Sequence, residues 1–282
     1  MKQRPSALLY CAFVALLVLP ACLKHGPITG PPGQYLFRIS QINDRSAYPD
    51  SFKVYYNRKG YPTKLLPSVV STGKPMWLFR YDDHQRLIAR IGAYDTGIPS
   101  FEMAYRYVHD PKGNIIRDSV YVFGRYDTTV NPVRIDAKAI RTTAYSYDNR
   151  DRIIRTVTTN LTPEFPHYRT TTNYYYNNDG NAWKIENIYL DVSLPDSLCV
   201  PHCPRPDTSV TYPVYGNKPD YHNLHPVWQF IDRNYNKNNA YKIISSDPYG
   251  LPREIAPAPP LEYMEVLGIF MPRAGLQYEY RP

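Results

Sequence analysis

Short stretches of alternating hydrophobic and polar residues recur along this chain, each followed by a polar turn and a second such stretch. In the clearest copy, residues 143–157, Tyr145 and Tyr147 precede the turn and Ile153 follows it. Side chains two residues apart lie on the same face of a β-strand, so this alternation predicts strands with one buried face. Asp148 opens the turn, where its side chain can hydrogen-bond to the following backbone. The stretch therefore predicts an antiparallel hairpin.

The hairpin pattern occurs about six times, at residues 52–65, 77–91, 103–116, 143–157, 172–185 and 243–255.

Glycine ends four of the six turns, at Gly60, Gly113, Gly180 and Gly250. A type I turn followed by a left-handed glycine forms a hairpin with a G1 bulge, so we expect a positive φ at these four positions. Asp151 tolerates the left-handed region moderately. The equivalent residue of the second hairpin is a glutamine at position 85, which tolerates it poorly, so another turn is expected there.

The repetition predicts an all-β fold, a soluble antiparallel β-meander of repeated hairpins that forms a curved open sheet or half-barrel. A transmembrane barrel is the alternative, but its strands need an unbroken apolar outer face. Here Arg, Lys and Thr occur on both faces of the predicted strands. This distribution favours the soluble sheet.

One short helix is predicted near the C-terminus, at about 223–233. Leu224, Val227, Trp228 and Ile231 follow helical spacing, and a proline in the first turn is tolerated. We expect this helix to cover the end or the concave face of the sheet.

Two other regions complete the predicted domain. The proline-rich residues 193–220 are expected to form a long loop. Residues 276–280 alternate again and predict a final strand.

The first 21 residues predict an export signal. Lys2 and Arg4 precede the apolar run 7–19, which is shorter than the roughly 20 residues of a membrane span. The run ends in Leu19-Pro20-Ala21-Cys22, which resembles the lipobox of bacterial lipoproteins. An ordinary secretory signal and an uncleaved anchor helix are the alternatives.

The lipobox resemblance implies that Cys22 is lipidated with up to three fatty acyl chains, such as palmitate. One chain binds a bilayer marginally, whereas two or more anchor a protein stably. Residues 22–34 contain glycine and proline without an apolar face, and predict a flexible tether before a single domain at 35–282.

Signal removal deletes Lys2 and Arg4 and no acidic residue, so the net charge falls from +8 to +6. The basic residues are scattered rather than clustered, which argues against a nucleic-acid partner.

In an oxidising compartment, Cys199 and Cys203 are expected to form a disulfide. A zinc site would need four ligands, and His202 could supply only a third, so metal is the weaker alternative.

The pattern Tyr-x-Tyr-Asp-x-x-Gly-(Arg or Asn)-x-(Ile or Leu) resembles the YD repeat of Rhs-type proteins. It also resembles a family of Bacteroidota lipoproteins of unknown function whose domain is described as porin-like. The repeat covers about 52–188 and is a structural signature that brings no catalytic residue with it. The resemblance implies attachment to the outer membrane, because no Asp follows Cys22. The segment Leu23-Lys24-His25 lacks the acidic surface-export signal of that phylum and implies the periplasmic side.

Motifs for catalysis, phosphate binding and catalytic zinc are absent from the sequence, and no cofactor is expected. His222 and His225 are close enough to share a metal, but polar residues at a helix start are the simpler interpretation. The acidic pairs Asp82-Asp83 and Asp148/Asp151 lie in predicted turns, where Asp is expected for conformational reasons.

Recognition is expected, if anywhere, on the tyrosine-rich face, with Tyr145, Tyr147, Tyr174 and Tyr176 as candidate ligand-binding residues. Aromatic faces stack on sugars and cations, although cross-strand packing explains the same pattern. The sequence therefore predicts a cell-envelope lipoprotein that is not an enzyme and has a structural or interaction role. Its partners would be the membrane, through the lipid, and a glycan or another envelope protein. A glycan-binding lipoprotein is the first alternative, and an unrecognised hydrolase is the second.

Overall fold

The computed structural model describes residues 37–46, 49–94, 97–162, 168–192, 206–259 and 261–280. The chain divides into two units, Met1–Tyr35 and Leu36–Pro282, and every described residue belongs to the second. The predicted signal, tether and lipidation site, and both cysteines of the predicted disulfide, lie outside the described residues. Within the described ranges, no helix is long and apolar enough to cross a membrane.

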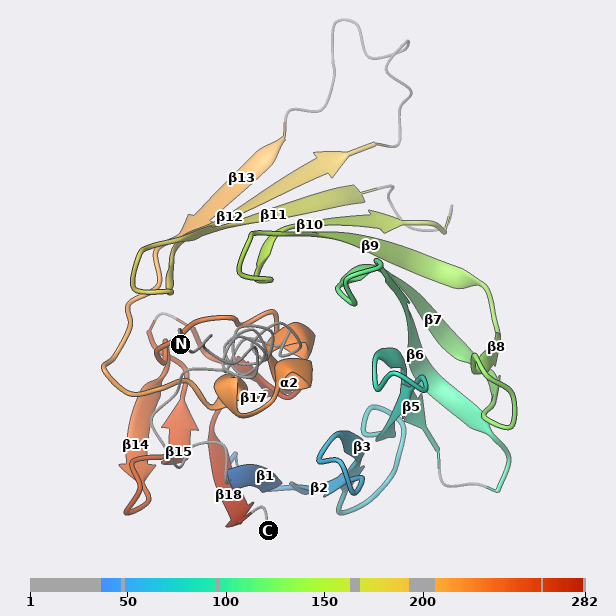
Figure 1. The fold of residues 1–282 in the computed structure, drawn as a ribbon, viewed down its shortest axis with the longest axis horizontal. Coiled ribbons are helices and arrows are strands. Elements are labelled where there is room, and N and C mark those ends of the chain that lie inside the picture. Colours follow the sequence, from blue (N-terminus) through green and yellow to red (C-terminus); the bar gives the residue numbers. More distant parts are fainter. Residues whose placement is uncertain are drawn as a thin grey trace, which may run out of the picture. The chain divides into compact units, whose positions relative to one another are not determined.

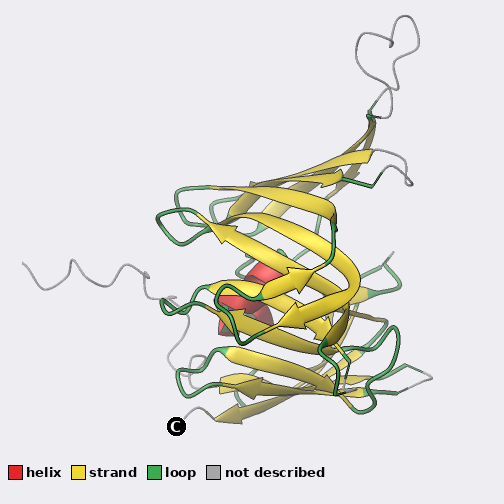
Figure 2. Ribbon diagram, turned by 90° about the vertical axis from the view of Figure 1, so that its right-hand side faces the viewer, coloured by secondary structure: helices red, strands yellow, loops and turns green. Residues whose placement is uncertain are grey.

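The second unit is built from antiparallel strands in one large open sheet, as the alternation predicted (Figures 1 and 2). Its strands run in the order β13-β12-β11-β10-β9-β7-β6-β5-β4-β3-β2-β1-β18-β15-β14, with β8 paired to β7. A separate two-stranded sheet joins β16 and β17. The sheet does not close into a barrel, because β13 at one edge does not pair with β14 at the other.

The strands are β1 (Phe37–Asp44), β2 (Ser51–Tyr56), β3 (Pro62–Pro67), β4 (Met76–Tyr81), β5 (Leu87–Ala93), β6 (Ser100–His109), β7 (Ile115–Asp127), β8 (Arg134–Asp136), β9 (Ala139–Tyr147), β10 (Ile153–Asn160), β11 (Tyr168–Tyr176), β12 (Ala182–Asp191), β13 (Asp207–Thr211), β14 (Lys242–Ser246), β15 (Pro252–Ala256), β16 (Met264–Val266), β17 (Ile269–Met271) and β18 (Ala274–Tyr280).

All six predicted hairpins form, and all use the same turn. In the fourth, the Asp148 N–H donates to the Arg152 carbonyl and the Asp151 N–H donates to the Asp148 carbonyl. The predicted positive φ is confirmed at all four glycines, with values from 83° to 97°. The expectation of a different turn at Gln85 is wrong, because Gln85 adopts φ 62° and its N–H donates to the Asp82 carbonyl. The flanking strand register imposes the turn on an unfavourable residue.

A bulge follows every one of these turns. In the fourth hairpin Tyr147 pairs with Ile153 but Ser146 pairs with Arg155, so Ile154 is an extra residue without a cross-strand partner. Extra residues in bulges increase the local twist of a strand pair. Six bulges placed at equivalent points therefore curve the sheet in a consistent direction.

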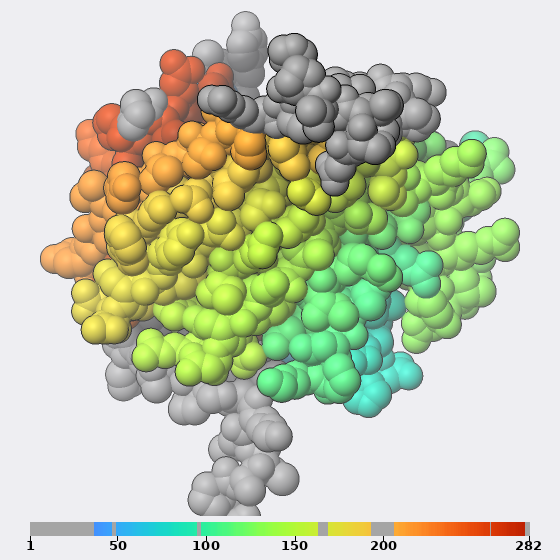
Figure 3. Space-filling view, turned by 90° about the horizontal axis from the view of Figure 1, so that it is seen from above, coloured from blue at the N-terminus to red at the C-terminus, as the bar shows by residue number. Residues whose placement is uncertain are grey.

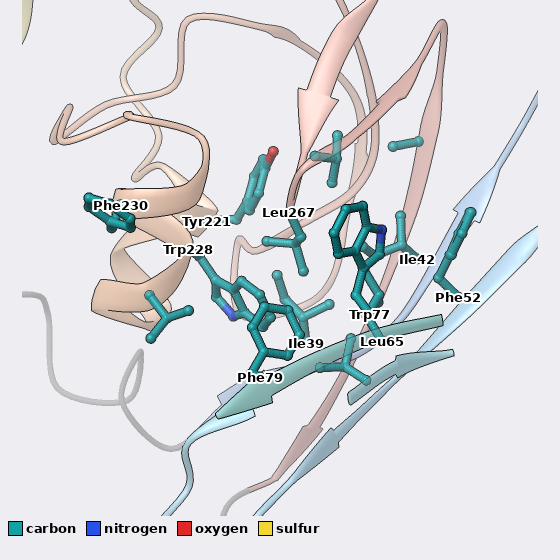
Figure 4. Packing of buried hydrophobic residues seen from close by; sticks show 14 of the residues in the cluster. Ile39, Ile42, Phe52, Leu65, Trp77, Phe79, Tyr221, Trp228, Phe230 and Leu267 are labelled. Carbon is teal, nitrogen blue, oxygen red and sulfur yellow. The ribbon is translucent and has the colours of Figure 1, made fainter. Parts of the chain in front are cut away.

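The helical segment lies inside the curve of the sheet, in agreement with the prediction (Figures 1 and 2). It is shorter than predicted and divided into a 3-10 turn, η3 (Tyr221–Leu224), and α2 (Pro226–Ile231). Trp228 packs edge-to-face on Phe79 with ring centroids 5.6 Å apart (Figure 4). Phe230 meets Tyr107 and Tyr145 at 5.4 and 5.2 Å. The helix thus joins rings from distant strands into one core.

A second apolar cluster lies apart from the main core. It joins Leu78, Ile91 and Phe101 of β4–β6 with Val133, and Ile135 of β8 packs against it. The chain around β8 thereby covers apolar side chains that the main core does not reach.

One expected loop contains regular structure. β13 lies within residues 193–220 and pairs with β12 over Ile185–Tyr189. Asp207–Thr211 contains no proline, and its Thr and Val residues suit a strand at a sheet edge.

Candidate functional site

The acidic and amide residues that open the turns serve as backbone acceptors. Asp148 Oδ1 accepts from the N–H groups of Arg150 and Arg152, at 2.9 and 3.0 Å, and its Oδ2 accepts from the Arg152 guanidinium. Burial alone would raise the pKa of Asp148, but these hydrogen bonds hold it below its usual value. The same positions in other hairpins, Asn57, Asp82 and Asp247, accept in the same way. These residues cap the turns through their side-chain oxygens, as the sequence suggested.

The tyrosine hydroxyls form a second repeated feature. A tyrosine directly before the turn donates to a backbone carbonyl of a neighbouring strand in four hairpins. The pairs are Tyr56–Ile39 at 2.7 Å, Tyr81–Pro62 at 2.8 Å, Tyr147–Ile115 at 2.8 Å and Tyr176–Ile153 at 3.1 Å. Each of these carbonyls lies next to a bulge, where the pairing between strands is interrupted. The tyrosine hydroxyl thus supplies the carbonyl with a hydrogen-bond donor.

The four candidate ligand-binding tyrosines face the interior. Tyr145 is buried, Tyr147 and Tyr174 are half-buried and packed against the core, and Tyr176 is half-buried. Of the four, Tyr145 is the one almost fully removed from solvent, and Tyr174 and Tyr176 also line a surface pocket. Alternation shows which residues share a face, but not which face meets the core. Ligand binding by these residues stays an untested prediction.

Two buried charges accompany these rings. The Tyr145 hydroxyl donates to Asp118, and burial raises the pKa of this carboxyl despite that bond. Arg233 lies over the Tyr145 ring, with 5.7 Å from its guanidinium carbon to the ring centroid. Opposite charges buried together offset part of the cost of removing each from water.

His222 forms the core of a buried ion cluster. Its Nδ1 lies 2.5 Å from Asp220 Oδ1 and its Nε2 lies 2.7 Å from Asp232 Oδ2. Burial lowers the pKa of His222, but the two carboxylates outweigh it and raise the pKa to about 10. The imidazole is therefore a cation at neutral pH, with both nitrogens donating.

Asp232 extends the cluster to the β16–β17 turn. Its carboxylate accepts from the N–H groups of Leu267 and Gly268 at 2.7 and 2.6 Å. Gly268 has φ 80°, in the left-handed region, and a Cβ there would overlap the guanidinium of Arg90, so a larger residue would displace Arg90. Arg90 in turn donates to the Gly268 carbonyl and stacks on Trp77 at 3.9 Å.

Glu265 lies beside the same cluster. Burial raises its pKa, and the negative charge of Asp232 raises it further, to about 7. Arg90, Asp232, Arg233 and Glu265 were not among the residues predicted from the sequence. A charged residue inside an apolar strand, as in Leu87–Ala93, was the available signal.

The two candidate metal ligands have different roles. His222 is enclosed by carboxylates, whereas His225 is the N-cap of α2, where its side chain accepts from the Val227 N–H. The interpretation of His225 as a polar residue at a helix start is confirmed. Among the described residues, no group of three or more His, Cys, Asp or Glu side chains is arranged to hold a metal ion.

Two surface pockets lie on the sheet. One, of about 460 Å³, has a lining that includes Arg152, Arg155, Asn173, Trp183 and three tyrosines, Tyr174, Tyr175 and Tyr176. The other, of about 420 Å³, is lined mainly by residues of β6 and β7. Neither includes His222.

Comparisons with known proteins describe the fold alone. No protein-family model matches the chain, and no curated protein matches it. A porin-like protein from Bacteroides vulgatus ATCC 8482 is 12% identical, with a TM-score of 0.45 over 86% of this chain and 98% of that one. A porin-like protein from Bacteroides uniformis ATCC 8492 is 12% identical, with a TM-score of 0.43 and the same coverages. TcdB2-TccC3 without its hypervariable C-terminal region is 15% identical, with a TM-score of 0.32 over 81% of this chain and 12% of that one. At these values the likeness carries no functional argument.

Proposed function

We propose that this protein is a lipid-anchored component of the cell envelope whose folded unit has a non-catalytic role in structure or interaction. The export signal and the Leu19-Pro20-Ala21-Cys22 motif support the anchor. The lack of an acidic segment after Cys22 supports attachment to the outer membrane on its periplasmic side.

One observation carries the non-catalytic part of the proposal. Among the described residues, His222 makes His–Asp contacts of the kind that hydrolases use, and its chemistry is unsuited to a general base. His222 is protonated at neutral pH, and both its nitrogens are occupied by carboxylates. A general base needs a neutral nitrogen within reach of a substrate proton and a pKa near the working pH.

The anchor is tested on protein purified from membranes. Mass spectrometry of the mature N-terminus is expected to show Cys22 carrying acyl chains, and Cys22→Ala is expected to leave the membrane fraction while Cys11→Ala stays in it. An unmodified Cys22, or a chain that begins at Met1, would refute the anchor.

The non-catalytic role is tested by incubating the full chain with a panel of ester, peptide and glycoside substrates. We expect no turnover. Turnover that His222→Gln abolishes and Tyr263→Phe retains would establish the hydrolase alternative instead.

A further inference from the structure

The bulge residues form a row on the outer side of the sheet. The extra residues of the six bulges are Thr63, Ile88, Ile116, Ile154, Trp183 and Arg253. Ile116, Ile154 and Trp183 are exposed. The repeat therefore places one outward side chain at the same point of each hairpin, and the fifth hairpin is the one that places a tryptophan there.

Trp183 stands between two further exposed rings. Its ring centroid lies 6.3 Å from that of Tyr175 on β11 and 6.3 Å from that of Tyr212, which follows β13. The exposed fractions are 50% for Trp183, 39% for Tyr175 and 63% for Tyr212. Figure 3 views this outer side, where β9 to β13 cross as bands from green to orange. Clustered exposed aromatic rings are typical of interaction sites, because each ring leaves a large apolar area in water.

The 460 Å³ pocket adjoins this aromatic row and adds polar groups to it. Arg152 is fixed there, since it pairs with Asp148 at 2.6 Å and stacks on the Tyr176 ring at 4.0 Å. Asn173 donates to Glu186 at 3.1 Å, which leaves its side-chain oxygen to accept from a ligand. The volume lies within the roughly 300–1,000 Å³ of small-molecule sites.

The charged side chains in the pocket indicate the sign of the charge on its ligand. Arg152 is neutralised by Asp148, and nearby Lys184 is neutralised by Glu186 at 2.8 Å. Arg155 is exposed and has no acidic partner among the residues that the structure describes. A guanidinium without a partner beside an aromatic surface favours an anionic, planar group such as a carboxylate.

From these observations we propose that the surface formed by Tyr175, Trp183 and Tyr212 and the adjoining pocket bind an acidic oligosaccharide. The apolar C–H face of one sugar ring stacks on Trp183, a hydroxyl meets Asn173, and a carboxylate meets Arg155. This inference names a ligand class for the interaction role proposed above. It does not depend on the lipid anchor, so the two can fail separately.

Binding is measured on the full chain in detergent, by calorimetry and by protection of tryptophan fluorescence from acrylamide. Trp77 and Trp228 are buried, so Trp183 is the tryptophan that a quencher reaches most easily. The acidic probe is a hexamer of galacturonate and the neutral probe is its methyl ester. We expect the acidic hexamer to bind and to protect Trp183, and the ester to bind at least about fivefold more weakly.

Two variants assign the contacts. Trp183→Thr copies the residue at the same bulge of the first hairpin and is expected to weaken binding of both probes by about tenfold or more. Arg155→Gln is expected to weaken the acidic hexamer about fivefold and to leave the ester unchanged. Tyr263→Ala removes an exposed ring outside this surface and is the matched control.

Several outcomes would overturn the proposal. The first is that the acidic hexamer does not bind at millimolar concentration. The second is that Trp183→Thr binds the probes as tightly as the unaltered protein does. The third is that the unaltered protein binds both probes equally. A change of oligomeric state in Trp183→Thr with unchanged sugar binding would assign the surface to self-association. The mass of the mature N-terminus, measured on the same preparation, reports the anchor independently.

Discussion

The left-handed position in the second hairpin offers a direct test of how the repeat is stabilised. Gln85 has φ 62°, whereas four of the other five turns use glycine at this position. An L-residue with a Cβ pays roughly 1–2 kcal/mol in the left-handed region, and glycine avoids this cost. Glycine in turn loses about 0.5–1 kcal/mol more conformational entropy on folding. Gln85→Gly also removes a long hydrogen bond of 3.4 Å that the Asn57 amide donates to the Gln85 side chain, and this bond contributes little.

Gln85→Gly is therefore expected to increase the free energy of unfolding by about 0.5–1 kcal/mol. For a domain of this size that corresponds to a rise in Tm of about 1–4 °C. Urea titration followed by tryptophan fluorescence measures it, because Trp77 and Trp228 are buried and report on the main core.

The reverse substitution is the matched control. Gly250 has φ 83°, and a Cβ there would meet nothing within 4 Å, so Gly250→Gln isolates the backbone cost. It should lower the free energy of unfolding by about the amount that Gln85→Gly raises it. Asp83→Gly, at a turn position without a positive φ, should destabilise. If Gln85→Gly destabilised the protein as much as Asp83→Gly does, the conformational argument would fail.

Three further predictions concern the interior. Tyr147→Phe should cost about 0.5–1.5 kcal/mol, since it leaves a partly buried carbonyl without its donor, whereas the exposed Tyr263→Phe should be near neutral. Equal losses measured by urea titration would refute a role for the hydroxyl. Trp228→Ala should cost about 3–5 kcal/mol, because it empties a site that is 1% exposed, and a loss below about 1 kcal/mol would show that α2 is dispensable. The folded state holds a proton on Glu265 that the unfolded state releases above its ordinary pKa of 4.5. The contribution of Glu265 to stability is thus present below pH 4.5 and is lost as the pH rises to about 7, so Glu265→Gln should flatten the fall in Tm over this window; an unchanged slope would place the titration elsewhere.

The buried ion cluster explains how a short helix can organise a large sheet. A six-residue helix such as α2 has little intrinsic stability, because helix nucleation is costly. The His222–Asp232 pair and the two N–H groups that Asp232 accepts connect the segment to the β16–β17 turn. Charged groups buried in pairs are specific in geometry, so the cluster selects one arrangement of helix and turn.

Much of the fold was present in the local sequence. The alternation of residues such as Tyr145 and Tyr147, the Asp or Asn that opens each turn, and the glycine that ends most of them predicted six hairpins and the open antiparallel sheet. These signals are readable because a hairpin is stabilised by residues close together in the chain. The spacing around Trp228 predicted the helix for the same reason.

The tertiary structure decided the rest. β1 pairs with β18, and Arg38 meets Glu279 at 2.5 Å across 241 residues, which no local pattern encodes. The sheet's curvature placed the candidate tyrosines inside and the bulge residue Trp183 outside, although all lie in the same repeat. It also brought Arg90, Asp232 and Glu265 together from distant segments. Alternation fixes which side chains share a face, but burial depends on which face closes over the helix, and that is a property of the whole chain.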